Sequence, residues 1–363
     1  MSMSDFSIAG RTIGEHESPY VIAEISANHR HQKAAAVELI HAAHEAGADA
    51  VKLQHYTAET ITVRSDHPDF KIGGGTLWDG RQLADLYAEA MTPWEWTADL
   101  AAAADKLGIV WFSSPFDPSA VDFLSSFNVP AYKIASFEIL DLPLIRYTAS
   151  FGKPLILSTG MATLSEIDAA VLAAKESGAP GVALLRCNSG YPAVPGEMDL
   201  CAIPVMRGLW QIPVGLSDHT LGTTAATVAV ALGACIVEKH LTLRRADGGP
   251  DAEFSAEPYE LANFIATLRE AHATLGTIRF GPSQRERSSL PFRRSLRAVL
   301  PIAAGDPITA NNVRSVRPAG GLNPDQIDLV VGMVADRDLE QGAPITFADL
   351  RPRQLKGEPS DAM

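Results

Sequence analysis

The chain has 363 residues, which suits one large domain and a small second one, and its formal net charge at pH 7 is −13. This acidic balance argues against a general nucleic-acid-binding protein, in which we would expect a basic patch. No apolar run approaches the roughly 20 residues of a membrane span, and the polar N-terminal stretch has no signal-peptide core. The three cysteines lack metal-site spacing, so we expect reduced thiols in a cytoplasmic protein.

Eight short apolar runs predict β-strands that are buried on both faces, because each is rich in Val, Ile, Leu and Ala. In chain order they are residues 20–25, 50–53, 109–112, 131–135, 154–157, 182–185, 214–216 and 235–237. Each run ends in a polar residue that is capable of chemistry. In a (β/α)₈ barrel the C-terminal ends of the strands surround one site, so these eight endings would converge there.

The segments between these runs predict helices, since they are rich in Ala and Leu at helical spacing. They are residues 33–46, 93–107, 118–127, 164–177 and 223–232, with a last helix around 259–275. Gly47, Gly108, Gly152 and Gly233 stand where helix C-caps are expected. We therefore predict a (β/α)₈ TIM barrel over residues 1–282. An open, doubly wound sheet is the alternative, because it also carries polar residues at its strand ends.

A polar, Arg-rich stretch follows the predicted barrel and indicates a linker at 283–293. Beyond it, the sequence Gly-x-Pro-Ile-Thr occurs at 305–309 and again at 342–346, each time before a short polar segment and an apolar residue. This repeat predicts a compact, turn-rich domain of two related halves at 294–355, before a tail at 356–363. A domain this small would gain stability by docking on a barrel, as a passive cap.

His219 and His240 follow the last two predicted strands. Two imidazoles at neighbouring strand ends can bind one divalent metal and leave positions open for a carbonyl oxygen. The alternative is a structural role, with each histidine hydrogen-bonded at the end of its strand.

Lys52 and Lys133 lie within apolar strands, although lysine is seldom buried unless it is paired. Such lysines serve either as Schiff-base nucleophiles or as cations that bind an anionic substrate. Hydroxyl donors suited to phosphate and carboxylate oxygens end other strands, at Ser114, Ser136, Ser158 and Ser217. Anion binding is therefore favoured. Glu24 and Glu138 are then candidates for an acid or a base, or for ion pairing with the lysines.

Taken in order, these residues resemble the sialic acid synthase family, the phosphoenolpyruvate-condensing nonulosonate synthases. The matching motifs are Ile-Ala-Glu-Ile at 22–25, Lys-Leu-Gln at 52–54, Ser-Ser-Pro-Phe at 113–116, Tyr-Lys-Ile-Ala-Ser-Phe-Glu at 132–138, Ser-Thr-Gly-Met at 158–161, Gly-Leu-Ser-Asp-His-Thr at 215–220 and Val-Glu-Lys-His at 237–240. The C-terminal repeat resembles the antifreeze-like (SAF) domain of that family. The resemblance covers nearly the whole chain.

The resemblance implies that C3 of phosphoenolpyruvate attacks the aldehyde of an open-chain N-acylated amino-hexose. Water adds at C2, and phosphate leaves with cleavage of its C–O bond. The matching positions imply phosphoenolpyruvate contacts at Lys52, Ser114, Lys133, Ser136, Ser158 and Ser217. They imply a divalent metal, usually Mn²⁺ with Mg²⁺ or Co²⁺ as alternatives, on His219 and His240. Substrate contacts on the sugar side would come from Glu24, Gln54, Asn188, Tyr191 and Asp251, with Glu24 and Glu138 handling water and protons.

In this family the SAF domain reaches across a homodimer and places an arginine of an Arg-Pro segment in the partner's site. Here the matching segment, Ser-Val-Arg-Pro, occupies 315–318, so the resemblance implies that Arg317 acts in trans. Two other readings stay open. One is a class I aldolase with Lys133 as its Schiff base, and the other is a carbohydrate-binding protein with an inactive barrel.

The sequence of one loop helps to predict which sugar is the substrate. Residues 73–81 read Gly-Gly-Gly-Thr-Leu-Trp-Asp-Gly-Arg, where synthases that use N-acetylmannosamine have an Asn, and Ser189 replaces a second Asn. The loop resembles that of the family members that make pseudaminic acid from 2,4-diacetamido-2,4,6-trideoxy-altrose. Trp78 would fit the 6-deoxy end of that sugar, or it is a packed anchor of the loop. N-acetylneuraminate or legionaminic acid synthesis from a manno-configured sugar is the alternative.

Overall fold

The computed structural model describes residues 6–353, so the predicted tail at 356–363 lies outside the described residues. The chain divides into two compact units, and the boundary falls between Gly276 and Thr277. Within residues 6–353, no helix is both long enough and apolar enough to cross a membrane.

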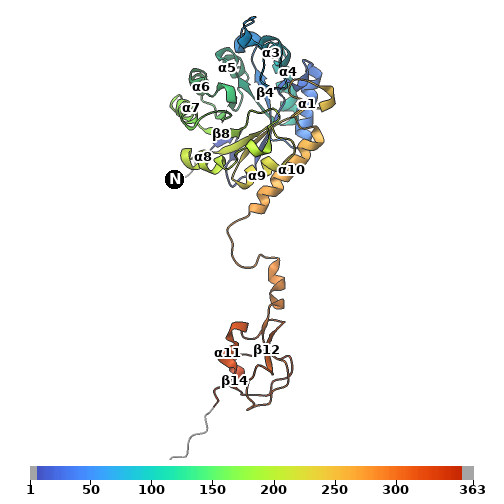
Figure 1. Ribbon diagram of the computed structural model, residues 1–363, viewed down its shortest axis with the longest axis vertical. Coiled ribbons are helices and arrows are strands. Elements are labelled where there is room, and N and C mark those ends of the chain that lie inside the picture. Colours follow the sequence, from blue (N-terminus) through green and yellow to red (C-terminus); the bar gives the residue numbers. More distant parts are fainter. Residues whose placement is uncertain (1–5, 354–363) are drawn as a thin grey trace, which may run out of the picture. The chain divides into compact units, whose positions relative to one another are not determined.

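The first unit is a closed barrel of eight parallel strands in the order β10-β3-β4-β5-β6-β7-β8-β9 (Figure 1). Its strands are β3 (Tyr20–Glu24), β4 (Ala50–His55), β5 (Val110–Pro115), β6 (Tyr132–Ile134), β7 (Leu155–Ser158), β8 (Val182–Cys187), β9 (Val214–Asp218) and β10 (Ile236–His240). Pairing between β10 and β3 closes the ring, with His240 opposite Glu24. The predicted (β/α)₈ barrel is confirmed, and the open sheet is excluded.

Several strands continue past the end of the predicted apolar run. β4 reaches His55, and β9 and β10 include Asp218 and His240. Their polar ends still pair with neighbouring strands, as Gln54 does with Ser114. Hydropathy places the end of a strand too early here, because the barrel mouth is polar while its backbone remains hydrogen-bonded.

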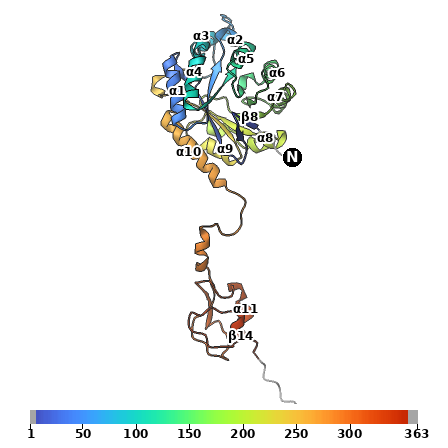
Figure 2. The same cartoon turned by 180° about the vertical axis from the view of Figure 1, so that it is seen from behind.

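Helices surround the barrel in both views (Figures 1 and 2). They are α1 (Lys33–Glu45), α2 (Ala58–Ile61), α3 (Leu83–Ala90), α4 (Thr97–Leu107), α5 (Pro118–Ser125), α6 (Leu142–Ala149), α7 (Leu164–Glu176), α8 (Ala202–Trp210), α9 (Thr224–Ala231) and α10 (Pro258–Leu275). The predicted helix at 93–107 begins later, at Thr97, after a 3₁₀ turn. Gly108 caps α4 with φ +72°, a left-handed conformation that favours glycine.

Nine 3₁₀ helices lie within the described residues: Ser26–His29, Pro68–Phe70, Trp94–Trp96, Ser136–Glu138, Pro195–Glu197, Arg245–Asp247, Glu286–Phe292, Pro324–Gln326 and Phe347–Asp349. Those at Ser26–His29 and Ser136–Glu138 directly follow β3 and β6, so they present side chains at the mouth.

A short hairpin precedes the barrel and was not predicted from the sequence. It consists of β1 (Phe6–Ile8) and β2 (Arg11–Ile13), whose Phe6, Ile8 and Ile13 are buried in the main core. A Cβ on Gly181 would lie 2.9 Å from Cδ2 of Phe6. Because Gly181 directly precedes β8, the hairpin packs at the N-terminal ends of the strands, opposite the polar mouth.

The second unit has its own core of buried aliphatic residues. It contains β11 (Ser295–Ala298) paired with β12 (Val313–Val316), α11 (Ile327–Val330), and β13 (Val334–Ala335) paired with β14 (Leu350–Arg351). The two sequence repeats adopt matching conformations. Gly305 and Gly342 both have φ +90°, and Ile308 and Ile345 are both buried.

Candidate functional site

The strand ends bring most of the predicted site residues together at the C-terminal mouth of the barrel. The following are buried there: Glu24, Lys52, Ser114, Lys133, Ser136, Ser158, Ser217, His219 and His240. Gln54, Glu138, Asn188, Tyr191 and Asp251 are partly exposed. Alternation along each strand explains this placement, since every second side chain points into the barrel.

Each of the two predicted lysines donates a hydrogen bond to a serine on the next strand. The Lys52 ammonium lies 3.2 Å from Ser114 Oγ, and the Lys133 ammonium lies 2.6 Å from Ser158 Oγ. Burial lowers the pKa of Lys133, although Glu238 opposes this effect. Two buried ammonium groups, each hydrogen-bonded to a serine hydroxyl, form a cradle in which an anion with several oxygens can be bound.

Glu238 is the counter-ion of this cradle, although it was not predicted as a site residue from the sequence. Its Oε1 lies 3.7 Å from the Lys52 ammonium and 4.0 Å from that of Lys133, and it accepts a hydrogen bond from Ser217 (3.2 Å). Burial opposes ionisation of Glu238, but the two lysines lower its pKa. Its position in the sequence could have indicated this role. Glu238 lies two residues before His240, so both side chains lie on the same face of β10.

Glu24 lies beside the same lysine. It forms an ion pair with Lys52 and accepts hydrogen bonds from the Ser26 backbone N–H (2.8 Å) and from Gln54 Nε2 (3.2 Å). Burial raises the pKa of Glu24 to about 7, although Lys52 acts in the opposite direction. Because its pKa is near neutrality, Glu24 can exchange a proton at physiological pH.

Glu138 and Ser136 reach the mouth from the 3₁₀ turn that follows β6. Ser136 Oγ accepts the backbone N–H of Gly160 (3.2 Å). A Cβ on Gly160 would lie 2.7 Å from Ser136 Oγ and 2.2 Å from Ser189 Oγ, so glycine is required for these serines to approach. Burial raises the pKa of Glu138 to about 7, and within residues 6–353 its Oε2 has no hydrogen-bond partner.

His219 and His240 lie next to each other at the ends of the neighbouring strands β9 and β10, with ring centroids 5.3 Å apart and ring planes inclined by 60°. Nδ1 of His219 lies 2.8 Å from the Asn188 carbonyl oxygen, which leaves its Nε2 free to bind a metal. Nδ1 of His240 is buried without a hydrogen-bond partner among the described residues, and it lies 3.9 Å from Asp251 Oδ2. The pair therefore fits a divalent metal whose remaining positions are filled by water or substrate. Within residues 6–353, no group of three or more His, Cys, Asp or Glu side chains could hold a metal.

Aromatic rings border the histidines. The Tyr191 ring lies 4.5 Å from that of His219, and the Trp78 ring lies 5.6 Å from that of Tyr191. Trp78 also donates its indole N–H to the Pro250 carbonyl (2.9 Å), so it anchors its loop while it contacts the mouth. A separate cavity of about 540 Å³ is lined by Met161, Cys187, Asn188 and Ser189, among others, and none of these aromatic rings or histidines lines it.

Two predicted site residues, Asn188 and Arg317, differ from the rest in where their side chains lie. The Asn188 side chain is used within its own loop, where it accepts the Gly190 N–H (2.8 Å) and donates to the Glu197 carbonyl (2.9 Å). Its backbone carbonyl, rather than its amide, contacts the site through His219. Arg317 is exposed on the second unit, next to Pro318.

A closed parallel barrel with buried lysines, carboxylates and histidines at its C-terminal mouth is the architecture of a barrel enzyme. The sequence matches the NeuB family over residues 39–279 and the SAF domain over residues 293–351. It is 40% identical over 332 residues to a pseudaminic acid synthase of Campylobacter jejuni, covering 92% of this chain and 96% of that one. A pseudaminic acid synthase of Helicobacter pylori is 38% identical over 336 residues, with 92% and 98% covered.

A crystal structure of an N-acetylneuraminic acid synthetase from Leptospira borgpetersenii, in complex with citrate, has the same fold. Its TM-score is 0.71 at 31% sequence identity, and the alignment covers 80% of this chain and 96% of that one. The chain therefore belongs to the NeuB family and is a nonulosonate synthase with a C-terminal SAF domain.

Proposed function

We propose that this protein condenses phosphoenolpyruvate with 2,4-diacetamido-2,4,6-trideoxy-altrose and water, and that it releases pseudaminic acid and phosphate. The observation that carries the proposal is the buried pair of ammonium groups, Lys52 and Lys133, with Ser114 and Ser158 as their partners. A small, strongly anionic substrate would match this cradle. In water the attraction between these cations and an anion would be weak. Because the cradle is buried, the attraction is stronger.

In this reaction the cradle holds the carboxylate and phosphate oxygens of phosphoenolpyruvate. Lys52, Lys133 and the hydroxyls of Ser114, Ser136 and Ser158 donate to those oxygens, while Glu238 keeps the lysines aligned. Ser217, which donates to Glu238 in the free protein, would turn its hydroxyl to the substrate. C3 of phosphoenolpyruvate forms the new C–C bond to the aldehyde carbon, and the aldehyde oxygen takes up a proton. Water adds to C2 and loses a proton, which leaves a hydroxyl and the phosphate group on C2. The bond between C2 and the phosphate oxygen then breaks as the hydroxyl becomes the 2-keto group, and the hydroxyl proton leaves with phosphate.

Glu24 and Glu138 handle the two protons in this scheme. Both carboxyl groups have a pKa of about 7 because burial disfavours their charged forms. General acid–base catalysis is most effective when the pKa of the group lies near the working pH. Glu24 is held by Lys52 and Gln54, whereas Glu138 keeps one oxygen without a partner among residues 6–353.

His219 and His240 would hold a divalent metal, with Mn²⁺ as first choice and Mg²⁺ or Co²⁺ as alternatives. Such an ion would act as a Lewis acid on the sugar aldehyde. The unpartnered Nδ1 of His240 supports the proposal, since a buried polar atom without a partner costs free energy in the absence of a ligand. Asn188 would fix the ring of His219 through its carbonyl oxygen.

The sugar would lie on the side of Gln54, Tyr191 and Asp251. Asp251 is paired with Ser26 and lies near His240, so it can accept hydrogen bonds from sugar hydroxyls. Trp78 offers an apolar surface to the 6-deoxy end of the altrose derivative. These contacts favour pseudaminic acid as the product over N-acetylneuraminate or legionaminic acid.

The proposal includes a homodimer in which the SAF domain completes the partner's site. Arg317 would supply a guanidinium to the acyl carbonyl or hydroxyls of the sugar, because its planar fork donates in fixed directions. Its exposure on the SAF unit leaves it free to make such a contact.

The experiment that tests the substrate is a phosphate-release assay with phosphoenolpyruvate and three sugars. They are the altrose derivative, N-acetylmannosamine and the 2,4-diacetamido-trideoxy-mannose that leads to legionaminic acid. We expect the highest kcat/KM with the altrose derivative. Preference for either manno-configured sugar would overturn the subtype and leave the condensation itself intact.

A further inference from the structure

Two buried charged residues near the strand ends are not used by the proposed reaction, although each directly precedes one of the two histidines in sequence. Asp218 precedes His219, and Lys239 precedes His240. Both are buried, and the Lys239 ammonium lies 2.9 Å from Asp218 Oδ2. Since side chains alternate along a strand, this ion pair lies on the opposite face of the sheet from Ser217, Glu238 and the histidines.

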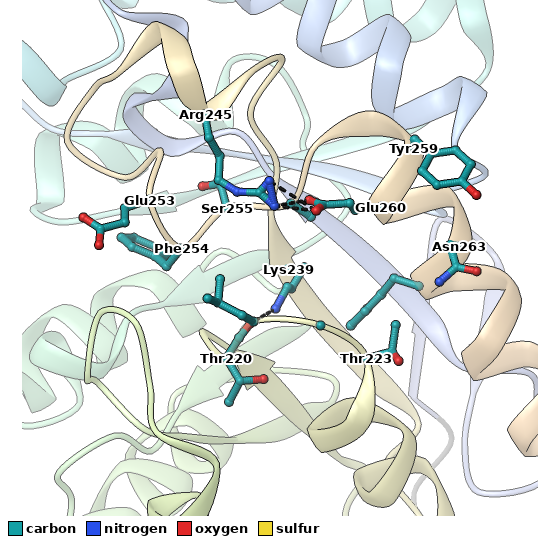
Figure 3. Close-up of a pocket in the computed structure, with 14 residues that line it drawn as sticks. Thr220, Thr223, Lys239, Arg245, Glu253, Phe254, Ser255, Tyr259, Glu260 and Asn263 are labelled. Carbon is teal, nitrogen blue, oxygen red and sulfur yellow. Dashed lines mark hydrogen bonds and ion pairs between the residues drawn. The ribbon is translucent and has the colours of Figure 1, made fainter.

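The helical layer confirms this orientation. The Lys239 ammonium lies 5.4 Å from the ring centre of Phe264 on α10, which packs outside the barrel. Lys239 also lines a cavity of about 420 Å³ together with Asn263 and Tyr259 of the same helix (Figure 3). The ion pair therefore lies on the outer face of the barrel strands, between them and α10, whereas the histidines lie on the inner face.

Hydrogen bonds extend the ion pair to both sides of His219. Asp218 Oδ1 accepts the backbone N–H (2.9 Å) and the hydroxyl (2.7 Å) of Thr220. The Lys239 ammonium donates to the Thr220 carbonyl as well (Figure 3). The Lys239 ammonium thus bonds to both neighbours of His219 in sequence, Asp218 and Thr220, while Lys239 itself directly precedes His240.

This connection begins where the backbone pairing ends. The ladder between β9 and β10 has its last pair at Asp218 and Lys239, whereas the ladder between β10 and β3 continues to His240. His219 and His240 both lie one residue past that last pair. The β9–β10 ladder therefore does not extend to the two histidines, whereas the buried ion pair links the residues that directly precede them.

We propose that Asp218 and Lys239 are positioning residues that hold His219 and His240 at the separation needed to share one divalent metal. This inference rests on the metal site of the proposed function. Neither residue touches substrate in this scheme, because both point away from the mouth. Their effect passes through the backbone of the two strand ends.

The test measures Mn²⁺ binding by titration calorimetry in Asp218→Asn and Lys239→Met, without substrates. Partners that orient metal ligands typically contribute 10–100-fold in metal affinity, so we expect each variant to bind Mn²⁺ at least roughly tenfold more weakly. Lys239→Arg keeps the charge and should recover part of the affinity. The adjoining cavity can admit water to Lys239 in Asp218→Asn, which helps this variant to fold.

Arg245→Gln is the matched control. It breaks the ion pair with Glu260 on the same cavity wall and leaves the strand ends untouched (Figure 3). We expect its Mn²⁺ affinity to equal that of the wild type. Asp218→Asn or Lys239→Met with a lowered Tm and wild-type Mn²⁺ affinity would assign the pair to stability alone and overturn the inference.

A second measurement separates this inference from the metal site on which it rests. Crystal structures of the metal-free wild type and metal-free Asp218→Asn give the spacing of the two imidazoles directly. We expect the spacing to change in the variant, and unchanged spacing overturns the inference. A wild type that binds no Mn²⁺ would overturn the metal site, and the spacing alone would then decide on the positioning role.

Discussion

Glu238 Oε1 lies 3.7 Å from the Lys52 ammonium, and this buried contact joins β10 to β4 across the barrel mouth. The same oxygen lies 4.0 Å from the Lys133 ammonium. A single carboxylate therefore lies near two cations that would otherwise repel each other in a site of low dielectric constant, and Glu24 forms a second ion pair with Lys52. An anionic substrate brings further negative charge to the same two lysines.

Replacing Glu238 by Gln should destabilise the free enzyme and increase its stabilisation by phosphoenolpyruvate. Removing one partner of a buried ion pair costs about 3 kcal/mol, because the remaining charges are left uncompensated. The bound anion supplies the missing negative charge. Urea denaturation with and without phosphoenolpyruvate measures both effects. Ser217→Ala, which removes only one hydrogen bond to Glu238, is the control and should cost about 1 kcal/mol.

Lys133→Met should weaken phosphoenolpyruvate binding by roughly 10- to 100-fold, since it removes a charge-assisted hydrogen-bond donor. Lys133→Arg keeps the charge and should lose less. Calorimetric titration of phosphoenolpyruvate measures the affinities. Borohydride added during turnover distinguishes this role from that of a Schiff base, and we expect no loss of activity. Irreversible inactivation with a covalent adduct on Lys133 would favour the aldolase alternative.

Glu138 gives a prediction about stability and pH. Burial raises its pKa from 4.5 to about 7, so between these values the folded protein binds a proton that the unfolded chain has released. Its favourable contribution is complete below about pH 4.5 and is lost as the pH rises through about 7, and it amounts to roughly 3 kcal/mol. Glu138→Gln should therefore flatten this part of the curve of unfolding free energy against pH. An unchanged curve would contradict the raised pKa.

Catalysis provides a separate test of the same carboxyl group. If Glu138 transfers a proton, the profile of kcat/KM against pH has a limb near pH 7 that disappears in Glu138→Gln. Glu24 also has a pKa of about 7, so Glu24→Gln must be measured in parallel. A limb that persists in Glu138→Gln and vanishes in Glu24→Gln assigns the titrating group to Glu24.

The two histidines should make the enzyme dependent on a divalent metal. Chelation is expected to abolish activity, and His219→Ala or His240→Ala should bind Mn²⁺ too weakly for rescue at ordinary concentrations. His55→Gln is a matched control, since His55 is also buried but is hydrogen-bonded to Ser113 and Thr97. We expect it to lower Tm and leave the Mn²⁺ affinity unchanged. Full turnover in a chelator would rule out the metal.

The barrel could be predicted from the sequence because its strands are buried on both faces and therefore uniformly apolar. The hairpin at Phe6–Ile8 and Arg11–Ile13 could not, since three-residue strands give no recognisable periodicity. Glu238 was missed for a related reason. A carboxylate next to a lysine in sequence looks like a local ion pair, whereas alternation directs Glu238 into the barrel and Lys239 out of it.

Arg317 should act in the partner's barrel, and mixed dimers test this arrangement. Arg317→Ala and His240→Ala are each expected to be inactive, because each removes one component of every site. In a heterodimer of the two variants, one site combines an intact barrel with an intact SAF domain. Equal mixing with subunit exchange should therefore restore about a quarter of the wild-type activity. Arg353→Ala, a change at another exposed arginine of the SAF unit, is the control and should retain activity alone. If verified heterodimers stay inactive, Arg317 does not act in trans.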